Sequence, residues 1–222
     1  MSSVPVAVVT GSNKGIGFAI VQALCKQFPG DVYLTARDPG RGQEAVAKLQ
    51  KEGLHPHFHQ LDIDDLQSIR ALRDFLKEKY GGLNVLVNNA GIAFKVHDTT
   101  PFAVQAEVTL KTNFFGTRNI CTELLPLMKP YGKCNVTSRE TVLCEVWSSL
   151  NRKILSSLSN TLPHSKRSAC CSAVGVKTNM AGPQATKSPD EGAETPVYLA
   201  LLPSNADGPH GQFVINKIVQ PW

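Results

Sequence analysis

The sequence of 222 residues lacks several features that would assign it to a specialised class of protein. It has no apolar run near the roughly 20 residues that a transmembrane helix needs, so a membrane-spanning protein is not expected. No basic segment followed by an apolar segment comes after Met1, so we expect no secretory signal. The six cysteines form no C-x-x-C pair and no repeated spacing, which favours reduced thiols in a cytoplasmic protein over a disulfide framework.

Basic residues exceed acidic residues only modestly. The 23 Lys and Arg against 18 Asp and Glu give a net charge of +5 and a pI of about 8.9. They form no long run with interleaved aromatic residues, so nucleic acid is not an expected partner. An excess of this size is typical of lysines and arginines that are exposed to solvent. The alternative is that some of these cations bind a small anionic ligand.

Three histidines alternate in the segment HPHFH. On a strand, His55, His57 and His59 would point to one face, where imidazoles can bind zinc. No nearby cysteine or further acid completes such a site. The segment therefore favours the start of a surface strand, and no metal is predicted.

Apolar, strand-like runs alternate with segments of helical spacing over the first two thirds of the chain. VPVAVVT is a continuous apolar run, as expected of a strand that is buried on both faces. The other expected strands are 31–37, 57–63, 83–91, 133–137 and 211–219. The expected helices are 15–29, 41–52, 65–80, 107–128 and 188–202, the last with a capping serine and acids in its first turn. This order predicts an α/β fold, a doubly wound parallel sheet of the Rossmann type, in a single domain over residues 1–222.

The turn TGSNKGIG, Thr10–Gly17, lies between the first expected strand and the first expected helix. Glycines let a backbone approach a pyrophosphate closely, and a helix N-terminus supplies amide donors and the positive end of a dipole. With three glycines in a strand–turn–helix setting, a dinucleotide site is favoured over a simple tight turn.

Two cations indicate which dinucleotide binds. Arg37 follows the second strand, where many NAD-binding folds place an acid for the ribose hydroxyls. Lys14 lies in the glycine loop, so the two cations converge near the adenosine ribose and favour a 2′-phosphate, hence NADP(H) over NAD(H). Asp62 and Ile63 follow the third strand, where adenine would lie; the alternative for Asp62 is to cap the next helix.

The spacing G-x-x-x-G-x-G, together with NNAG at Asn88–Gly91, resembles the short-chain dehydrogenase/reductase family. The runs FHQLDIDDLQSIRALRDFLKEKYGGLNVLVNNAGIAFK, LKTNFFGTRN and EGAETPVYLALLP narrow the resemblance to the cytosolic carbonyl reductases of that family. It covers Ser2 to about Ser138 and about Ser168 to Trp222. It implies a monomeric, cytoplasmic oxidoreductase that uses NADPH to reduce quinones, aldehydes and ketones, including prostaglandin or steroid carbonyls.

The resemblance also implies roles for individual residues. Asn113 in LKTN matches the catalytic asparagine, which bends its helix and anchors a water, and Ser138 matches the catalytic serine. The implied cofactor-binding residues are Gly11, Asn13, Lys14, Gly15, Ile16, Gly17, Arg37, Asp62, Ile63, Asn89 and Ala90. The implied substrate-binding residues, where the family holds small carbonyl compounds and glutathione-like groups, are Phe94, Lys95, Val96, Gln105 and Ser138.

The chain departs from the family where the chemistry is carried out. The family's Tyr-x-x-x-Lys pair places a lysine one helical turn after a tyrosine, which is thereby made a better proton donor. None of the four tyrosines here is followed by lysine at the fourth position. The segment for this pair, most of its helix and the start of the sixth strand are absent, and a basic, serine-rich stretch at about 139–168 takes their place. Loss of a general acid costs about 10²–10⁴ in rate.

Three interpretations follow. The first is an NADPH-dependent carbonyl reductase that is impaired in this chain, and the second is a catalytically inactive NADPH-binding pseudoenzyme or a non-functional variant product. The third is that the basic segment from Val146 to Pro189 binds a partner or an anion, although a poorly ordered filler is favoured there. We also expect the loss of the sixth strand and its helix to expose apolar surface of the fourth and fifth strands. Cys170 and Cys171, where the sixth strand should end, are expected to be core thiols rather than a redox pair.

Overall fold

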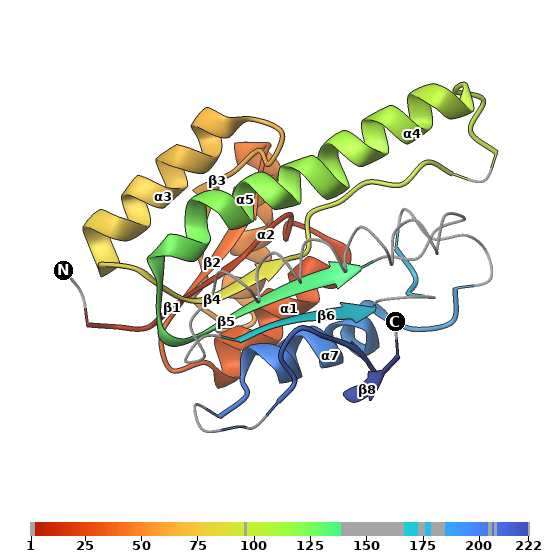
Figure 1. Cartoon of the computed structure of the whole chain (residues 1–222). Coiled ribbons are helices and arrows are strands. Elements are labelled where there is room, and N and C mark those ends of the chain that lie inside the picture. The colour runs from red at the N-terminus through yellow and green to blue at the C-terminus, as the bar shows by residue number, and fades with distance from the viewer. Residues whose placement is uncertain are drawn as a thin grey trace.

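The computed structural model describes residues 3–95, 97–138, 167–172, 176–178, 185–203, 206 and 208–221. Their strands form one eight-stranded sheet in the order β3-β2-β1-β4-β5-β6-β7-β8, with helices on both faces (Figure 1). Neighbouring strands are parallel except for β7 and β8. The predicted doubly wound parallel sheet is confirmed. Its strand order reverses between β1 and β4, and such a reversal opens a crevice beyond the carboxyl ends of the strands.

The strands are β1 Val6–Val9, β2 Asp31–Ala36, β3 His57–Gln60, β4 Leu83–Asn88, β5 Met128–Ser138, β6 Arg167–Ser172, β7 Gln212–Ile215 and β8 Ile218–Gln220. The helices are α1 Gly15–Gln27, α2 Pro39–Lys51, α3 Leu66–Tyr80, α4 Phe102–Leu110, α5 Thr117–Leu124 and α7 Pro189–Ala200. A π-helical segment, Lys111–Gly116, joins α4 to α5, and a 3-10 turn, Leu125–Leu127, follows α5. Within the described ranges, no helix has both the length and the apolar character needed to cross a bilayer.

The core lies in two layers, one on each side of the sheet. In β1, Val6 and Val8 pack with α3 and α5, whereas Ala7 and Val9 pack with α1, α2 and α7. All four side chains are 0% exposed. Burial on both faces explains why this strand is a continuous apolar run instead of an alternating one.

Two expected elements differ from those observed. The long helix begins at Phe102 rather than at residue 107, and its π-helical segment separates two α-helical parts. The expected last strand is a hairpin of β7 and β8. Its turn residues Asn216 and Lys217 have φ angles of 49° and 65°, the left-handed backbone that a two-residue hairpin turn requires.

The sixth strand is formed, although the chain is expected to lack the residues that begin it in the family. β6 pairs in parallel with β5 on one side and with β7 on the other. The apolar residues of the neighbouring strands, such as Leu86 in β4 and Val136 in β5, are buried at 0% and 4% exposure. The predicted exposure of β4 and β5 is therefore wrong. Cys171 is a buried free thiol, as predicted, whereas the side chain of Cys170 lies outside the described part of the chain.

The starts of α3 and α7 follow local capping signals. Ser188 Oγ accepts from the Glu191 N–H at 3.2 Å, and the Glu191 carboxylate accepts from the Ser188 N–H at 2.6 Å, which forms the predicted capping box of α7. Asp65 caps α3 by accepting from the Gln67 N–H at 2.9 Å. The capping alternative for Asp62 is therefore wrong.

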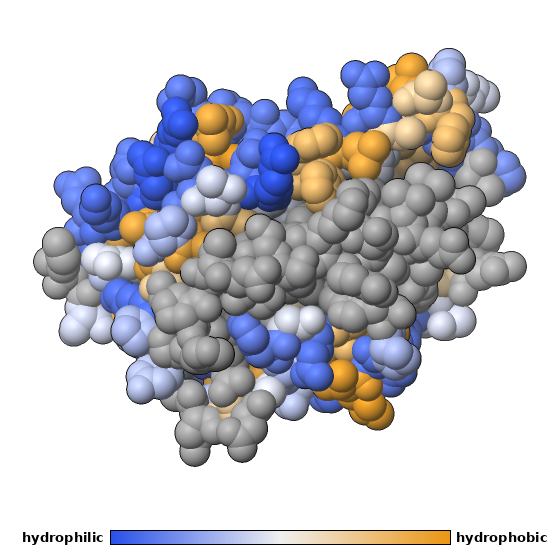
Figure 2. Space-filling view, in the orientation of Figure 1, coloured by the Kyte–Doolittle hydropathy of each residue, from blue (hydrophilic) through white to orange (hydrophobic). Residues whose placement is uncertain are grey.

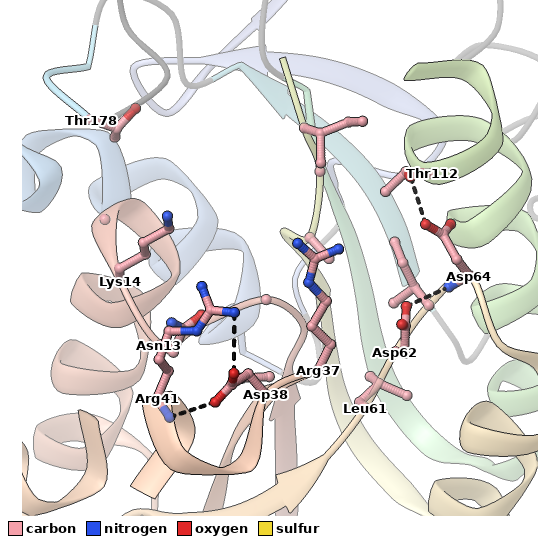
Figure 3. A pocket seen from close by; sticks show the side chains of 17 residues that line it. Asn13, Lys14, Arg37, Asp38, Arg41, Leu61, Asp62, Asp64, Thr112 and Thr178 are labelled. Atoms are coloured by element: carbon pink, nitrogen blue, oxygen red, sulfur yellow. Dashed lines mark hydrogen bonds and ion pairs between the residues drawn. The ribbon is translucent and has the colours of Figure 1, made fainter. Parts of the chain in front are cut away.

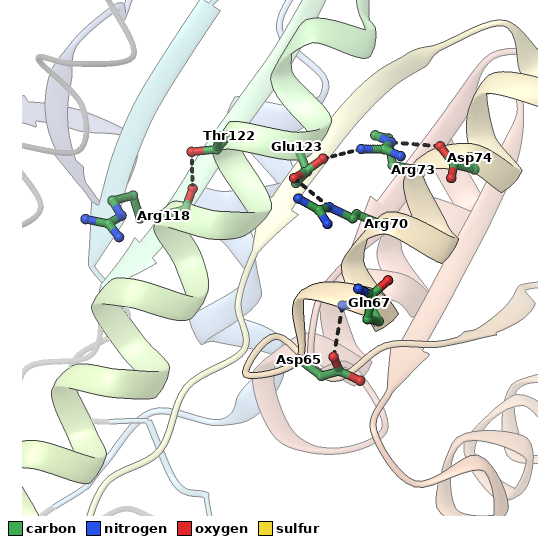
Figure 4. A network of polar contacts seen from close by, with 8 residues as sticks. All are labelled: Asp65, Gln67, Arg70, Arg73, Asp74, Arg118, Thr122 and Glu123. Carbon is green, nitrogen blue, oxygen red and sulfur yellow. Dashed lines mark hydrogen bonds and ion pairs between the residues drawn. The ribbon is translucent and has the colours of Figure 1, made fainter.

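α3 and α5 are joined by charged side chains (Figure 4). Glu123 on α5 accepts hydrogen bonds from Arg70 at 3.2 Å and from Arg73, both on α3. Burial raises the pKa of the Glu123 carboxyl, but the two guanidinium groups outweigh burial and hold this pKa below its usual value. The pairing keeps α5, and the π-helical segment before it, against α3.

α4 projects from the body of the molecule and has no buried residue. Its apolar side chains gather on the surface at the upper right of the space-filling view (Figure 2). Phe102, Val104 and Val108 of α4 and Phe115 of the π-helical segment are between 38% and 69% exposed.

Candidate cofactor site

A cavity of about 230 Å³ opens beyond the carboxyl ends of β1, β2, β3 and β4 (Figure 3). This is the crevice at the reversal of strand order, where open α/β sheets bind their ligands. It is lined by Gly11, Asn13, Lys14, Gly15, Ala36, Arg37, Asp38, Arg41, Leu61, Asp62, Ile63, Asp64, Ala90, Gly91, Ile92, Thr112 and Thr178. Eight of the eleven residues implied for cofactor binding are in this lining.

Close packing against the NNAG turn shapes the glycine loop. Gly11 has a φ of +58°, and a Cβ at this position would lie 2.7 Å from the Ala90 Cα, so glycine is required. Asn89 Nδ2 donates to the carbonyls of Thr10 and Gly11, each at 3.0 Å. Thr10 Oγ1 accepts from the N–H groups of Asn89 and Ala90 at 3.0 and 2.9 Å. These contacts bring the N-terminus of α1 to the cavity wall, where backbone amides can bind an anion.

Lys14, Arg37 and Arg41 line the cavity on the side of the glycine loop and α2 (Figure 3). Arg41 also pairs with Asp38 at 3.2 Å. The Arg41 N–H donates to Asp38 Oδ1 at 2.9 Å, and this hydrogen bond is the main reason why the pKa of Asp38 is lowered. Arg41 is absent from the residues inferred from the sequence, although it follows Arg37 by only four positions. Two positive charges in excess of Asp38 suit a phosphate group.

Residues 61–64 form another wall of the cavity. Leu61 and Ile63 are 3% and 5% exposed and give this wall an apolar surface. The Asp62 N–H donates to Ser68 Oγ at 2.9 Å, and Asp62 Oδ1 accepts from the Asp64 N–H at 3.0 Å. The Asp62 carboxylate is thus held in one orientation beside an apolar surface that could accept a flat ring.

Asn113 supports the wall at Gly91 and Ile92 from behind. Its Oδ1 accepts from the Ile92 N–H at 2.8 Å, and its Nδ2 donates to the Ile92 carbonyl at 2.9 Å. The packing is close, because a Cβ at Gly91 would lie 3.2 Å from Asn113 Oδ1. Asn113 lies in the π-helical segment, and single turns of π-helix inside α-helices are frequent at functional sites.

Three residues implied for cofactor binding lie behind the cavity wall. Ile16 and Asn89 are each 1% exposed, and Gly17 is also buried. A Cβ at Gly17 would lie 2.4 Å from Asn89 Nδ2, so α1 and the NNAG turn touch at this point. Across the loop, Thr178 closes the cavity near Gly15, at which a Cβ would lie 3.3 Å from the Thr178 methyl carbon.

The implied substrate-binding residues are only partly described. Phe94 and Lys95 continue the chain beyond the cavity wall at Ile92, and Val96 lies outside the described residues. Gln105 Nε2 donates to the Thr100 carbonyl at 2.7 Å, so this amide group holds the loop before α4. The backbone of Ser138 ends β5 opposite Ser172, whereas its side chain is outside the described part.

None of the four tyrosines, all of which the structure describes, lines the cavity. Tyr33 and Tyr80 are buried with their hydroxyl oxygens 2.9 Å apart, and Lys79 Nζ donates to the Tyr33 hydroxyl at 2.9 Å. Tyr80 also donates to Asp31, the first residue of β2. This tyrosine–lysine contact therefore lies toward the amino-terminal edge of the sheet, away from the cavity.

The described residues contain no group of three or more His, Cys, Asp or Glu that could hold a metal ion. His57 Nε2 lies 3.5 Å from Asp31 Oδ1, and its ring stacks on Tyr33 at a centroid distance of 5.1 Å. His59 Nδ1 lies 2.6 Å from the Gln60 carbonyl oxygen. These two histidines of HPHFH thus contact protein groups.

Residues 5–142 match the model of the short chain dehydrogenase family. The chain belongs to this family. Carbonyl reductase [NADPH] 1 of Mus musculus is 53% identical over 276 aligned positions, which cover 100% of this chain and 99% of that protein. The protein of the same name from Homo sapiens is 52% identical with the same coverage.

Solved structures of short-chain dehydrogenases share the fold. Salutaridine reductase from Papaver somniferum superposes with a TM-score of 0.77 at 27% identity, covering 94% of this chain and 99% of that one. A metagenomic short-chain oxidoreductase in complex with NADP gives a TM-score of 0.71 at 24% identity, covering 96% and 98%.

The alignment with the mouse protein spans 276 positions, whereas this chain has 222 residues, so 54 aligned positions are gaps in this chain. This chain thus keeps the short-chain dehydrogenase fold although it has fewer residues than the mouse protein within the aligned region. The difference supports the prediction that an internal segment is missing.

Proposed function

We propose that this protein binds NADPH in the cavity and is a reductase of small carbonyl compounds. The observation that carries the proposal is the convergence of Lys14, Arg37 and Arg41 beside the glycine loop at the reversal of strand order. The relatives at 52–53% identity, named Carbonyl reductase [NADPH] 1, support the choice of cofactor and substrate class. When bound, NADPH would supply a hydride.

The residues of the cavity fit the parts of this cofactor. The three cations would bind the 2′-phosphate, the N-terminus of α1 the pyrophosphate, and the apolar wall at Leu61 and Ile63 the adenine. Asn113 would keep the wall at Ile92 in place through its two hydrogen bonds.

The residues needed for proton transfer are less complete than those that would bind the cofactor. The chain has no Tyr-x-x-x-Lys, and no tyrosine lines the cavity. We propose that Ser138 and Asn113 polarise the carbonyl group and that water donates the proton, with a rate reduced by about 10²–10⁴. A second candidate function, an NADPH-binding protein without turnover, is favoured by the same absence.

The proposal also covers the oligomeric state, the cellular location and the substrates of the protein. We propose a monomeric, cytoplasmic protein whose substrates are quinones, aldehydes and ketones, and whose cleft at Phe94, Lys95, Val96 and Gln105 also accepts glutathione adducts. A ligand that uses the Gln105 amide would compete with its hydrogen bond to the Thr100 carbonyl, which predicts weak binding of such adducts.

Titration of the purified protein with NADPH and with NADH tests the cofactor site. Lys14→Ala/Arg37→Ala should weaken NADPH binding by about 10- to 100-fold and leave NADH binding nearly unchanged, because two charge-assisted hydrogen bonds to the 2′-phosphate are removed. Lys48→Ala/Lys51→Ala on the exposed end of α2 is the matched control, since it removes the same charge away from the cavity. Equal loss in both double variants would refute a 2′-phosphate site.

Oxidation of NADPH with the quinone menadione then separates the two candidate functions. Turnover that disappears in Lys14→Ala/Arg37→Ala would establish a reductase. NADPH binding by the folded protein without turnover would leave the binding function. Equal turnover by Ser138→Ala and the parent protein would exclude the proposed role of Ser138.

A further inference from the structure

Thr112 ties the π-helical segment to the wall of the cavity at residues 61–64. Its Oγ1 donates to Asp64 Oδ2 at 2.7 Å (Figure 3). Thr112 is only 8% exposed, whereas Asp64 lies on the surface. A buried hydroxyl thus fixes the carboxylate of an exposed loop residue, and both residues line the cavity.

The next residue in the chain ties the same segment to the other wall. Asn113 makes its two hydrogen bonds to the Ile92 backbone at 2.8 and 2.9 Å. One turn of the π-helical segment therefore has anchors on two walls, one through Thr112 and one through Asn113. Loss of either anchor should loosen the turn that carries both residues.

The wall at residues 61–64 contacts the π-helical segment at further points. The Asp64 N–H donates to Asp62 Oδ1 at 3.0 Å, so the orientation of the Asp62 carboxylate depends on the position of Asp64. A Cβ at Gly116 would lie 3.0 Å from the Ile63 carbonyl oxygen, which shows that the end of the segment packs on the same wall. A continuous set of contacts thus runs from Asp62 through Asp64 and Thr112 to Asn113. We call the two hydrogen bonds of Asn113 to the Ile92 backbone the Asn113 clamp.

We propose that Thr112 is a positioning residue that couples the wall at 61–64 to the Asn113 clamp. In the ligand-free protein it holds Asn113 on the Ile92 backbone. In the complex it keeps the Asp64 carboxylate turned toward the π-helical segment, so that a negative charge does not swing toward the anionic cofactor. The second statement rests on the proposed NADPH function, whereas the first does not.

Hydrogen exchange of the ligand-free protein tests the first statement. Thr112→Val keeps the shape of the side chain and removes the hydroxyl. We expect the Ile92 amide, which donates to Asn113, to exchange about three- to tenfold faster in this variant, as the loss of one hydrogen bond predicts. Thr112→Ser restores a hydroxyl and should return the rate toward that of the parent, which a purely steric effect would not do.

Thr122→Val is the matched control, because Thr122 Oγ1 donates to the Arg118 carbonyl at 3.0 Å on α5 (Figure 4). It removes a threonine hydroxyl bond from the same continuous helix, away from the cavity, and should leave the Ile92 amide unchanged. An unchanged Ile92 rate in Thr112→Val would overturn the coupling. A uniform rise over all amides, β1 included, would show general destabilisation and would also overturn it.

Titration with NADPH tests the second statement. Thr112→Val should raise the NADPH dissociation constant by about three- to tenfold, and Thr112→Val/Asp64→Asn should recover part of the loss because the loop no longer carries the charge. No recovery in the double variant would refute the electrostatic role of Asp64. If the parent protein binds no NADPH, the proposed function and this second statement fail together, while the exchange result still decides the first.

Discussion

Replacement of Gly17 by alanine tests whether tertiary contacts outweigh helix propensity. Gly17 lies in the first turn of α1, and in a helix interior alanine is favoured over glycine by about 1 kcal/mol. The added Cβ, however, would lie 2.4 Å from Asn89 Nδ2 and 2.8 Å from the Gly11 carbonyl oxygen. Because Asn89 Nδ2 donates to the Thr10 and Gly11 carbonyls, the clash displaces a group that makes two hydrogen bonds.

The opposing contributions decide the sign of the effect. Overpacking costs about 1–3 kcal/mol, and each hydrogen bond lost costs about 0.5–1.5 kcal/mol. After the gain in helix propensity, we expect Gly17→Ala to lower the free energy of unfolding by about 1–3 kcal/mol. For a chain of this size, that corresponds to a fall in Tm of roughly 2–12 °C. Urea and thermal unfolding of the variant and the parent measure both quantities.

Gly40→Ala is the matched control, because Gly40 lies in the first turn of α2 and its Cβ would meet only Asp38 Oδ1 at 3.4 Å, an ordinary contact. It should stabilise the protein by up to about 0.5–1 kcal/mol. A stabilising effect of Gly17→Ala equal to that of Gly40→Ala would refute the argument from tertiary packing. We also expect Gly17→Ala to weaken NADPH binding, since the glycine loop moves with Asn89.

Two further predictions concern stability. Burial, followed by hydrogen bonds to Asp31 and Tyr33, raises the pKa of Tyr80 far above its usual value. Above pH 10 the unfolded chain loses the Tyr80 proton, which the native protein retains. The free energy of unfolding should therefore fall as pH rises, by up to about 1.4 kcal/mol per pH unit. Tyr80→Phe should flatten this fall, and urea unfolding of parent and variant between pH 9 and 11 measures it. Ser188→Ala removes the capping box of α7 and should cost about 0.5–2 kcal/mol at pH 7. Because the pKa of Glu191 is lowered mainly by the Ser188 backbone N–H, which alanine retains, this difference between parent and variant should be similar at pH 7 and pH 3, and its disappearance at pH 3 would contradict the argument.

Local signals in the sequence predicted the parts of the site that depend on neighbouring residues. The glycine loop, Lys14 and Arg37 could be placed because a strand, a glycine turn and a helix follow one another within a few residues. Arg41 was missed because it points into the cavity only once α2 has packed beside β2. Thr112 was missed because it comes from a distant segment that meets the cavity only in the folded chain.

The sequence by itself determined the order of strands and helices, the dinucleotide loop, the capping box at Ser188 and the absence of Tyr-x-x-x-Lys. These are properties of residue type and short spacing, which do not depend on what packs from elsewhere. The tertiary structure decided that β6 fills the sheet and that Asn113 forms hydrogen bonds with the backbone of Ile92. These contacts join residues 34 and 21 positions apart, whose distance is set by the packing of helices on the sheet, and sequence spacing carries no record of it.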